Sequence, residues 1–155
     1  SPRKDERFVL RKIAKNVARI KYGYKKKLFL GDIKSKRDWG HAKDFANAMW
    51  LINTYKKTSD YIIGTGKLNS VESFTKKAFK YVGLDYKKHL KIDKKLLREK
   101  DSKARQANPA KLIKKLKWKM KFSFETLVFT GAPSFFQLGI NSSSAFVSNT
   151  LPLKI

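Results

Sequence analysis

The run Arg37-Asp38-Trp39-Gly40-His41-Ala42-Lys43-Asp44 lies between a short apolar segment, Leu28-Phe29-Leu30, and a stretch of helical periodicity. The apolar triplet predicts a strand. An amphipathic helix over 43–56 is predicted by the spacing of Phe45, Ala48, Met49, Ile52 and Tyr55. Arg37 therefore follows a strand and stands beside an indole ring and a glycine, where a guanidinium is well suited to grip a phosphate group.

The segments on either side of this run also alternate between helix and strand signals. Apolar residues spaced by four, four and three positions predict a helix over 7–22, with Gly23 as its stop. The run 60–66 is apolar and ends in Gly64-Thr65-Gly66, which predicts a buried strand. Ser70 then caps a helix that ends before Gly83. Strand, turn and capped helix in this order favour an α/β fold.

The rest of the chain gives weaker signals. Residues 84–107 are charged and irregular, so no regular element is predicted there. Asn108 is expected to cap a helix with Pro109 at its first position, and Ser123 to cap a last turn through Val128. From Phe129 onward the chain has no acidic residue and a single lysine. We therefore expect one domain over 1–128, followed by an atypical tail over 129–155.

Positive charge dominates the composition, with 37 Lys and Arg against 12 Asp and Glu in 155 residues and a net charge of +25. Such a charge can attract nucleic acid, so a basic nucleic-acid-binding module is an alternative to consider. The lysines are however scattered over every segment, as on solvated helix faces, and nucleic acid is not the expected partner. No apolar stretch is long enough to span a membrane, which favours a cytoplasmic protein.

Catalytic and metal-binding signals are sparse. There is no cysteine and only two histidines, so no metal site is predicted. His41 is more typical of a structural role near a helix start than of a general base. The sequence does offer separated cations that a fold could gather around phosphates: Arg3, Lys4, Arg11, Lys12, Arg37 and Arg98.

The order and spacing of several motifs resemble the C-terminal half of the GDP-mannose 4,6-dehydratases, which belong to the extended short-chain dehydrogenase/reductases. The block Arg37-Asp38-Trp39-Gly40-His41 is the most specific of them, and the resemblance extends over about 1–128. Further matches are Phe8-Val9-Leu10-Arg11-Lys12-Ile13, Ala48-Met49-Trp50-Leu51, Val82-Gly83-Leu84-Asp85-Tyr86 and Asn108-Pro109-Ala110-Lys111. This resemblance implies the C-terminal part of a Rossmann-type NAD(P)-binding fold together with the small mixed α/β substrate domain.

The resemblance also implies roles for individual residues. Arg3 and Lys4 would contact the NADP phosphates. The GDP part of the substrate would be surrounded by Val9, Lys12, Arg37, Arg98 and Asp101. Lys4 stands where the family usually has arginine and Asp101 where it usually has glutamate, which removes a bidentate contact at one position and shortens the reach at the other.

In the resembling family, NADP takes a hydride from C4 of GDP-mannose, water leaves across C5 and C6, and the hydride returns to C6, a step toward GDP-fucose. The family's catalytic Thr and Glu and its Tyr-x-x-x-Lys pair belong to a segment that precedes this sequence. The resemblance therefore implies a fragment that binds the nucleotide sugar, carries no catalytic residue and is inactive alone. The complete enzyme is expected to be a homo-oligomer. A related nucleotide-sugar epimerase or dehydratase is a further alternative.

Overall fold

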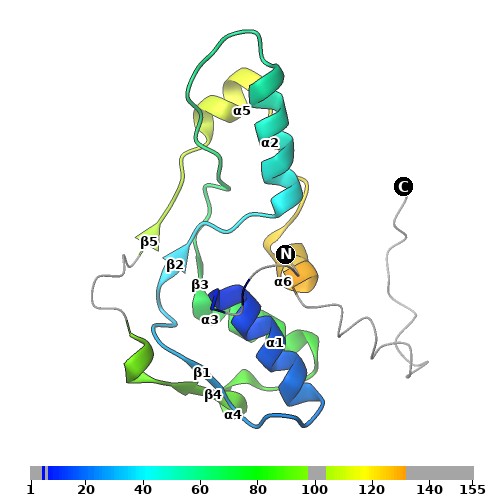
Figure 1. The fold of residues 1–155 in the computed structure, drawn as a ribbon, viewed down its shortest axis with the longest axis vertical. Coiled ribbons are helices and arrows are strands. Elements are labelled where there is room, and N and C mark those ends of the chain that lie inside the picture. Colours follow the sequence, from blue (N-terminus) through cyan, green and yellow to red (C-terminus); the bar gives the residue numbers. More distant parts are fainter. Residues whose placement is uncertain (1–4, 6, 98–103, 132–155) are drawn as a thin grey trace, which may run out of the picture.

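The computed structural model describes residues 5, 7–97 and 104–131, and these form an elongated α/β molecule (Figure 1). Its helices are α1 (Val9–Lys21), α2 (Ala42–Thr54), α3 (Val71–Tyr81), α4 (Tyr86–His89), α5 (Ala110–Leu116) and α6 (Phe124–Gly131), with a 3-10 turn, η1, at Lys94–Leu96. Its strands are β1 (Leu28–Leu30), β2 (Lys36–Arg37), β3 (Asn69–Ser70), β4 (Leu90–Ile92) and β5 (Ala104–Arg105).

Two hydrophobic clusters lie at the two ends of the molecule. The larger one joins α1, α3, β1 and α6 and includes the fully buried side chains of Ile13, Leu28 and Phe74. The smaller one joins α2 and α5 through Ala48, Leu112 and Trp118. Figure 1 shows α2 and α5 at one end and α1, α3 and α4 at the other, with β2, β3 and β5 between them. The middle of the molecule therefore carries the sequence run on which the fold prediction was built.

Local signals set the limits of α1 and α3 as predicted. Gly23 and Gly83 follow their last turns with φ of +77° and +73°, a conformation that glycine adopts without steric cost. The Ser70 hydroxyl accepts a hydrogen bond from the Ser73 amide at 3.0 Å, which caps α3. Likewise, the Ser123 hydroxyl accepts from the Thr126 amide at 3.1 Å at the start of α6. These helix predictions are confirmed.

The strands form two small sheets. In the first, β1 pairs in parallel with β4, with Leu28 opposite Leu90 and Leu30 opposite Ile92. In the second, β2 lies between β3, which is antiparallel to it, and β5, which is parallel. Lys36 is opposite Ser70 and Ala104, and Arg37 is opposite Asn69 and Arg105. The second sheet thus brings the arginine of the sequence run beside residues from two distant segments.

The β1–β4 sheet is covered only in part. Leu28 and Leu30 of β1 are buried, and Phe29, on the opposite face, is 45 % exposed. Ile92 is opposite Leu30 and shares its face, yet it is 52 % exposed. Leu96 and Leu97, just after β4, are also exposed. Parallel sheets in proteins are as a rule covered on both faces, so this partly covered pair is an unusual feature. In the part of the chain that the structure describes, no helix is long and apolar enough to cross a membrane.

Two predictions of regular structure are wrong. Residues 60–66 are not a strand, because their backbone pairs with no neighbouring strand; Tyr61 and Ile63 instead pack on the smaller cluster. The stretch 84–107 is not irregular, since its described part contains α4, β4, η1 and β5. These elements are two to four residues long, too short to produce a periodic signal.

The expected helix after Asn108 is present with a shifted start. Pro109 is the N-cap of α5, and the Asn108 side chain accepts from the Ala110 amide at 3.1 Å. At the other end of the chain, α6 continues through Gly131 and so runs across the predicted limit at 128. The domain boundary itself stays a prediction.

Candidate functional site

The structure places three of the seven predicted binding residues. Val9 and Lys12 lie on α1, where Val9 packs against the larger cluster, and Arg37 ends β2. The Arg37 Nη1 donates a hydrogen bond to the Lys36 carbonyl oxygen at 2.8 Å. Arg3, Lys4, Arg98 and Asp101 lie outside the described residues, so the gathering of these side chains around one diphosphate stays a prediction.

Lys12 has an environment that suits a ligand-binding cation. Its side chain is half-buried, and this burial lowers the pKa of its ammonium group. The positive charge of Lys25 lowers that pKa further, whereas Asp93, which follows β4, raises it. A cation so placed is poorly hydrated and lies close to another positive charge, and both conditions favour the approach of an anion.

Asp38, directly after β2, holds three chain segments together. Its Oδ1 accepts hydrogen bonds from the Thr65 amide at 2.8 Å and from the Thr65 hydroxyl. Its Oδ2 accepts from the amides of Gly66 at 2.8 Å and Ala107 at 3.2 Å. Its own amide donates to the Arg105 carbonyl oxygen at 3.1 Å. The backbone position of Arg37 is therefore fixed by its neighbour Asp38. Both carboxylate oxygens of Asp38 accept hydrogen bonds from within the protein.

These contacts also give a function to Gly64-Thr65-Gly66. The amides of a glycine-containing loop can surround an anion. Here the anion is the Asp38 carboxylate of the same chain rather than a phosphate. Sequence reasoning missed this role of Asp38. The sequence feature that could have indicated it is the Thr65-Gly66 pair. If this segment is a loop and not a strand, the two backbone amides need a hydrogen-bond acceptor from elsewhere in the chain.

Gly64 leaves no room for a side chain in this arrangement. A Cβ atom at this position would lie 2.2 Å from the Ala107 Cβ and 3.1 Å from the Asp38 Oδ2. We expect Gly64→Ala to lower the free energy of unfolding by about 2 kcal/mol, because the loop must move away from Asp38. Urea denaturation followed by tryptophan fluorescence measures the change.

The double variant Gly64→Ala/Ala107→Gly is the control for that result. Without the Ala107 Cβ, the nearest atom of residue 107 to the new Cβ is its Cα at 3.6 Å, an ordinary contact. The double variant is therefore expected to be more stable than Gly64→Ala alone. A single variant as stable as the wild type, or a double variant no better than the single one, would contradict the packing described here.

Asp44, the last residue of the sequence run, forms a second carboxylate junction. It is 3 % exposed, and its two oxygens accept from the amides of Lys121 at 3.0 Å and Phe122 at 3.1 Å. Its carbonyl oxygen accepts from the Trp118 indole Nε1 at 3.2 Å. The prediction that Asp44 lies in the first turn of a helix is confirmed, but its larger role is to attach the segment before α6 to α2.

His41 is the N-cap of α2, in agreement with a structural role. Its Nδ1 accepts from the Lys43 amide at 3.2 Å, which fixes a neutral ring with the proton on Nε2. The ring stacks on Phe122 with centroids 4.1 Å apart. Burial lowers the pKa of the imidazole, and the negative charge of Asp44 opposes that effect. A neutral, stacked histidine at a helix start is what the cap requires.

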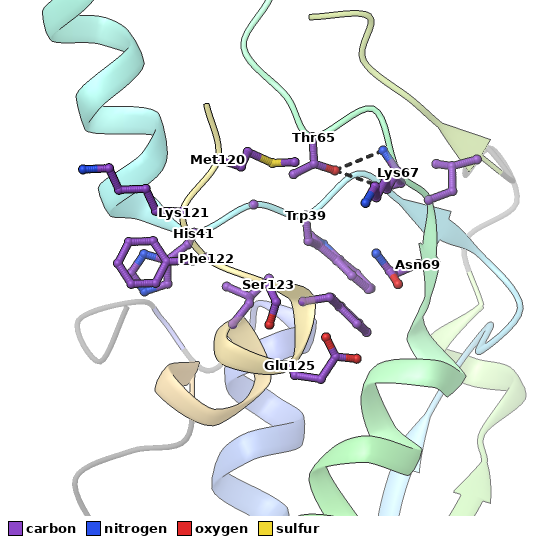
Figure 2. A pocket seen from close by; sticks show the side chains of 14 residues that line it. Trp39, His41, Thr65, Lys67, Asn69, Met120, Lys121, Phe122, Ser123 and Glu125 are labelled. Atoms are coloured by element: carbon purple, nitrogen blue, oxygen red, sulfur yellow. Dashed lines mark hydrogen bonds between the residues drawn. The ribbon is translucent and has the colours of Figure 1, made fainter. Parts of the chain in front are cut away.

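A cavity of about 560 Å³ lies between the start of α2, the loop before β3 and the segment that leads into α6. Figure 2 shows Trp39 in the middle of its lining, with Lys67 and Asn69 on one side and the stacked rings of His41 and Phe122 on the other. Val9, Lys12 and Arg37 are not part of this lining. The cavity is mixed aromatic and polar, and sequence reasoning did not predict it.

Comparison with solved structures shows which proteins share the fold of this chain. The chain superimposes on the RMD protein of Pseudomonas aeruginosa, solved with NADPH, with a TM-score of 0.78 at 17 % identity over 87 % of this chain and 44 % of that one. It also superimposes on the dTDP-glucose 4,6-dehydratase of Bacillus anthracis, solved with NAD, with a TM-score of 0.73 at 17 % identity, over 91 % of this chain and 42 % of that one. The chain therefore shares the fold of these two proteins, and the predicted α/β fold class, part of a Rossmann-type fold, is confirmed.

Sequence comparison identifies the family within that class. Residues 1–130 match the family profile of GDP-mannose 4,6 dehydratase. The chain is 43 % identical to GDP-mannose 4,6 dehydratase 1 of Arabidopsis thaliana over 128 residues, which is 83 % of this chain and 36 % of that protein. It is 35 % identical to the human GDP-mannose 4,6 dehydratase, again over 83 % of this chain and over 39 % of that protein. This chain belongs to the GDP-mannose 4,6-dehydratase family, and it spans well under half the length of these relatives.

Proposed function

We propose that this chain binds the GDP part of GDP-mannose for a GDP-mannose 4,6-dehydratase. The observation that carries the proposal is the family match over residues 1–130, which contains the whole run from Arg37 to Asp44. The related proteins of Arabidopsis and human are named for that substrate. A basic nucleic-acid-binding module is not favoured, because family membership accounts for the ordered motifs and positive charge alone supports the alternative.

The physical support for the proposal is the way in which Arg37 is presented. Asp38 binds two other segments through its backbone and side chain, so the strand that carries Arg37 cannot shift independently of them. A guanidinium on a fixed backbone loses less freedom when it binds a phosphate than one on a mobile loop. On α1, Lys12 offers a second cation in a half-buried setting. A diphosphate needs several such fixed positive charges.

The proposal also includes the cofactor, the location of the catalytic residues and the oligomeric state of the complete enzyme. NADP would supply the hydride acceptor and donor for the dehydration, with Arg3 and Lys4 as its contacts in this chain. The described residues of this chain would bind and orient the nucleotide sugar, and they would leave bond breaking to residues elsewhere in the enzyme. The setting of this activity would be a cytoplasmic homo-oligomer that produces the precursor of GDP-fucose.

Calorimetric titration with GDP-mannose tests the central claim. We expect Arg37→Ala to weaken binding by about 10- to 100-fold, because a bidentate charged contact to a phosphate is lost. Arg19→Ala is the matched control, since Arg19 is an exposed arginine near the end of α1. The proposal fails if the wild-type chain does not bind GDP-mannose, or if both variants bind it as the wild type does.

An assay of turnover tests whether this chain binds the substrate without catalysing its conversion. The purified chain, mixed with GDP-mannose and NADP, should yield no 4-keto product while it binds the sugar nucleotide. Formation of that product by this chain alone would overturn the proposal that the catalytic residues lie elsewhere.

A further inference from the structure

A second cation lies on the face of α1 that carries Lys12, and neither the sequence motifs nor the family resemblance indicated it. Asn16 follows Lys12 by four residues, so these two residues share one side of the helix. Lys25, in the loop between α1 and β1, reaches that side, because its Nζ donates a hydrogen bond to the Asn16 Oδ1 at 2.7 Å. A separate segment of the chain therefore brings an ammonium group to the helix face of Lys12.

Asn16 is a buried polar side chain that forms hydrogen bonds at both ends of its amide. It is 8 % exposed, and its Nδ2 donates to the Lys12 carbonyl oxygen at 2.7 Å, while its Oδ1 accepts from Lys25. The first hydrogen bond fixes the orientation of the amide, and the oxygen then faces the Lys25 ammonium group. Asparagine is a poor residue for the interior of a helix. What this asparagine contributes is the position of Lys25.

The two ammonium groups affect each other and have no close counter-charge. The positive charge of Lys25, together with burial, lowers the pKa of the Lys12 ammonium group. Within the described part of the chain, neither Lys12 nor Lys25 forms an ion pair with a carboxylate. Asp93 raises the pKa of Lys12 from beyond ion-pair distance, and its Oδ1 accepts from the Lys95 amide at 3.0 Å. Like charges held near each other are destabilising, and an anion that contacts both lysines would remove this repulsion.

We propose that Lys25 is a further phosphate-binding residue of the nucleotide-sugar site, that it acts together with Lys12, and that Asn16 is the positioning residue for Lys25. This inference rests on the proposed function and adds two residues to it. A lysine ammonium group has three donors, and the hydrogen bond to Asn16 uses one of them, so two remain for phosphate oxygens. Because the Asn16 amide is uncharged, it holds Lys25 without neutralising its charge.

The first test compares Lys25→Ala with Lys26→Ala in the whole chain, by calorimetric titration with GDP. Lys26 is the matched control, because it is an exposed lysine of the same loop and its removal changes the net charge by the same amount. We expect Lys25→Ala to weaken GDP binding about 10-fold, since a charged hydrogen bond to phosphate is lost. Lys26→Ala should stay within about 2-fold of the wild type. Thermal unfolding checks that each variant is folded.

The second test is a double-mutant cycle that separates positioning by Asn16 from a purely structural role. Asn16→Leu should weaken GDP binding about 3-fold, because Lys25 must then be ordered when the ligand binds. The same substitution in the Lys25→Ala variant should cause no further loss. A loss of the same size in both backgrounds would show that Asn16 does not act through Lys25, and it would overturn that part of the inference.

The outcomes for the inference and for the proposed function are distinct. Equal effects of Lys25→Ala and Lys26→Ala would overturn the inference and attribute any loss to general charge. If Arg37→Ala weakens GDP binding while Lys25→Ala does not, the proposed function stands and the role of Lys25 fails. If the wild-type chain does not bind GDP, the proposed function itself fails.

Discussion

Replacement of Asp38 by alanine is expected to lower the free energy of unfolding by about 4 kcal/mol. The variant loses a carboxylate that accepts hydrogen bonds from two groups of Thr65 and from the amides of Gly66 and Ala107. These donors belong to the loop before β3 and to the segment after β5, and amides left unpaired in a half-buried place are costly. Urea denaturation gives the free energy directly.

Asp60→Ala is the matched control for this experiment, because Asp60 is an exposed acid close to the same loop. Its removal changes the net charge by the same amount and should alter stability by less than about 0.5 kcal/mol. The variant Asp38→Asn, which keeps one acceptor oxygen, should fall between the wild type and Asp38→Ala. If Asp38→Ala proved as stable as Asp60→Ala, the hydrogen bonds that the Asp38 carboxylate accepts would contribute nothing measurable to the stability of the protein.

The second large effect is expected at Asp44. Asp44→Ala should lower the free energy of unfolding by about 3 kcal/mol, since it leaves the amides of Lys121 and Phe122 without their acceptor in a partly buried place. The expected change is local as well as global. Hydrogen exchange at these two amides should become faster than at the amides of α3, because the segment before α6 loses its attachment to α2.

The control here is Asp32→Ala. Asp32 also accepts an amide hydrogen bond, from Lys34 at 2.8 Å, but it is exposed and its partner is two residues away. Loss of such a local contact should cost less than about 1 kcal/mol and leave exchange at Lys121 and Phe122 unchanged. Unaltered exchange at those amides in Asp44→Ala would show that the junction does not hold the segment.

The sequence predicts features that depend on neighbouring residues, and it does not predict the distant hydrogen-bond partners of Asp38 and Asp44. Helices α1 and α3 were predicted well, because their periodicity, the Ser70 cap and the glycines after their last turns are local signals. The partners of Asp38 and Asp44 lie 27 to 78 residues away along the chain, and no local pattern indicates them. The sequence run was correctly recognised as decisive, but its acids, and not only its arginine, make it so.

The strand predicted over 60–66 was wrong for a related physical reason. A short apolar run ending in glycines fits a buried strand and equally fits a loop whose side chains fill a core. Here Tyr61 and Ile63 pack on the smaller cluster, and the amides of Thr65 and Gly66 find a carboxylate instead of a neighbouring strand. The pairing of Arg37 with Arg105 was equally hidden, because strands of two residues leave no periodic trace.

The partly covered sheet of β1 and β4 has a consequence for the behaviour of the chain in solution. Phe29 on one face and Ile92 on the other are exposed apolar side chains that favour association, while a net charge of +25 makes separate molecules repel one another. Dissolved salt weakens the repulsion and does not weaken the apolar association. Colloidal stability should therefore decline as ionic strength rises, and purification of this polypeptide calls for dilute buffers rather than concentrated salt.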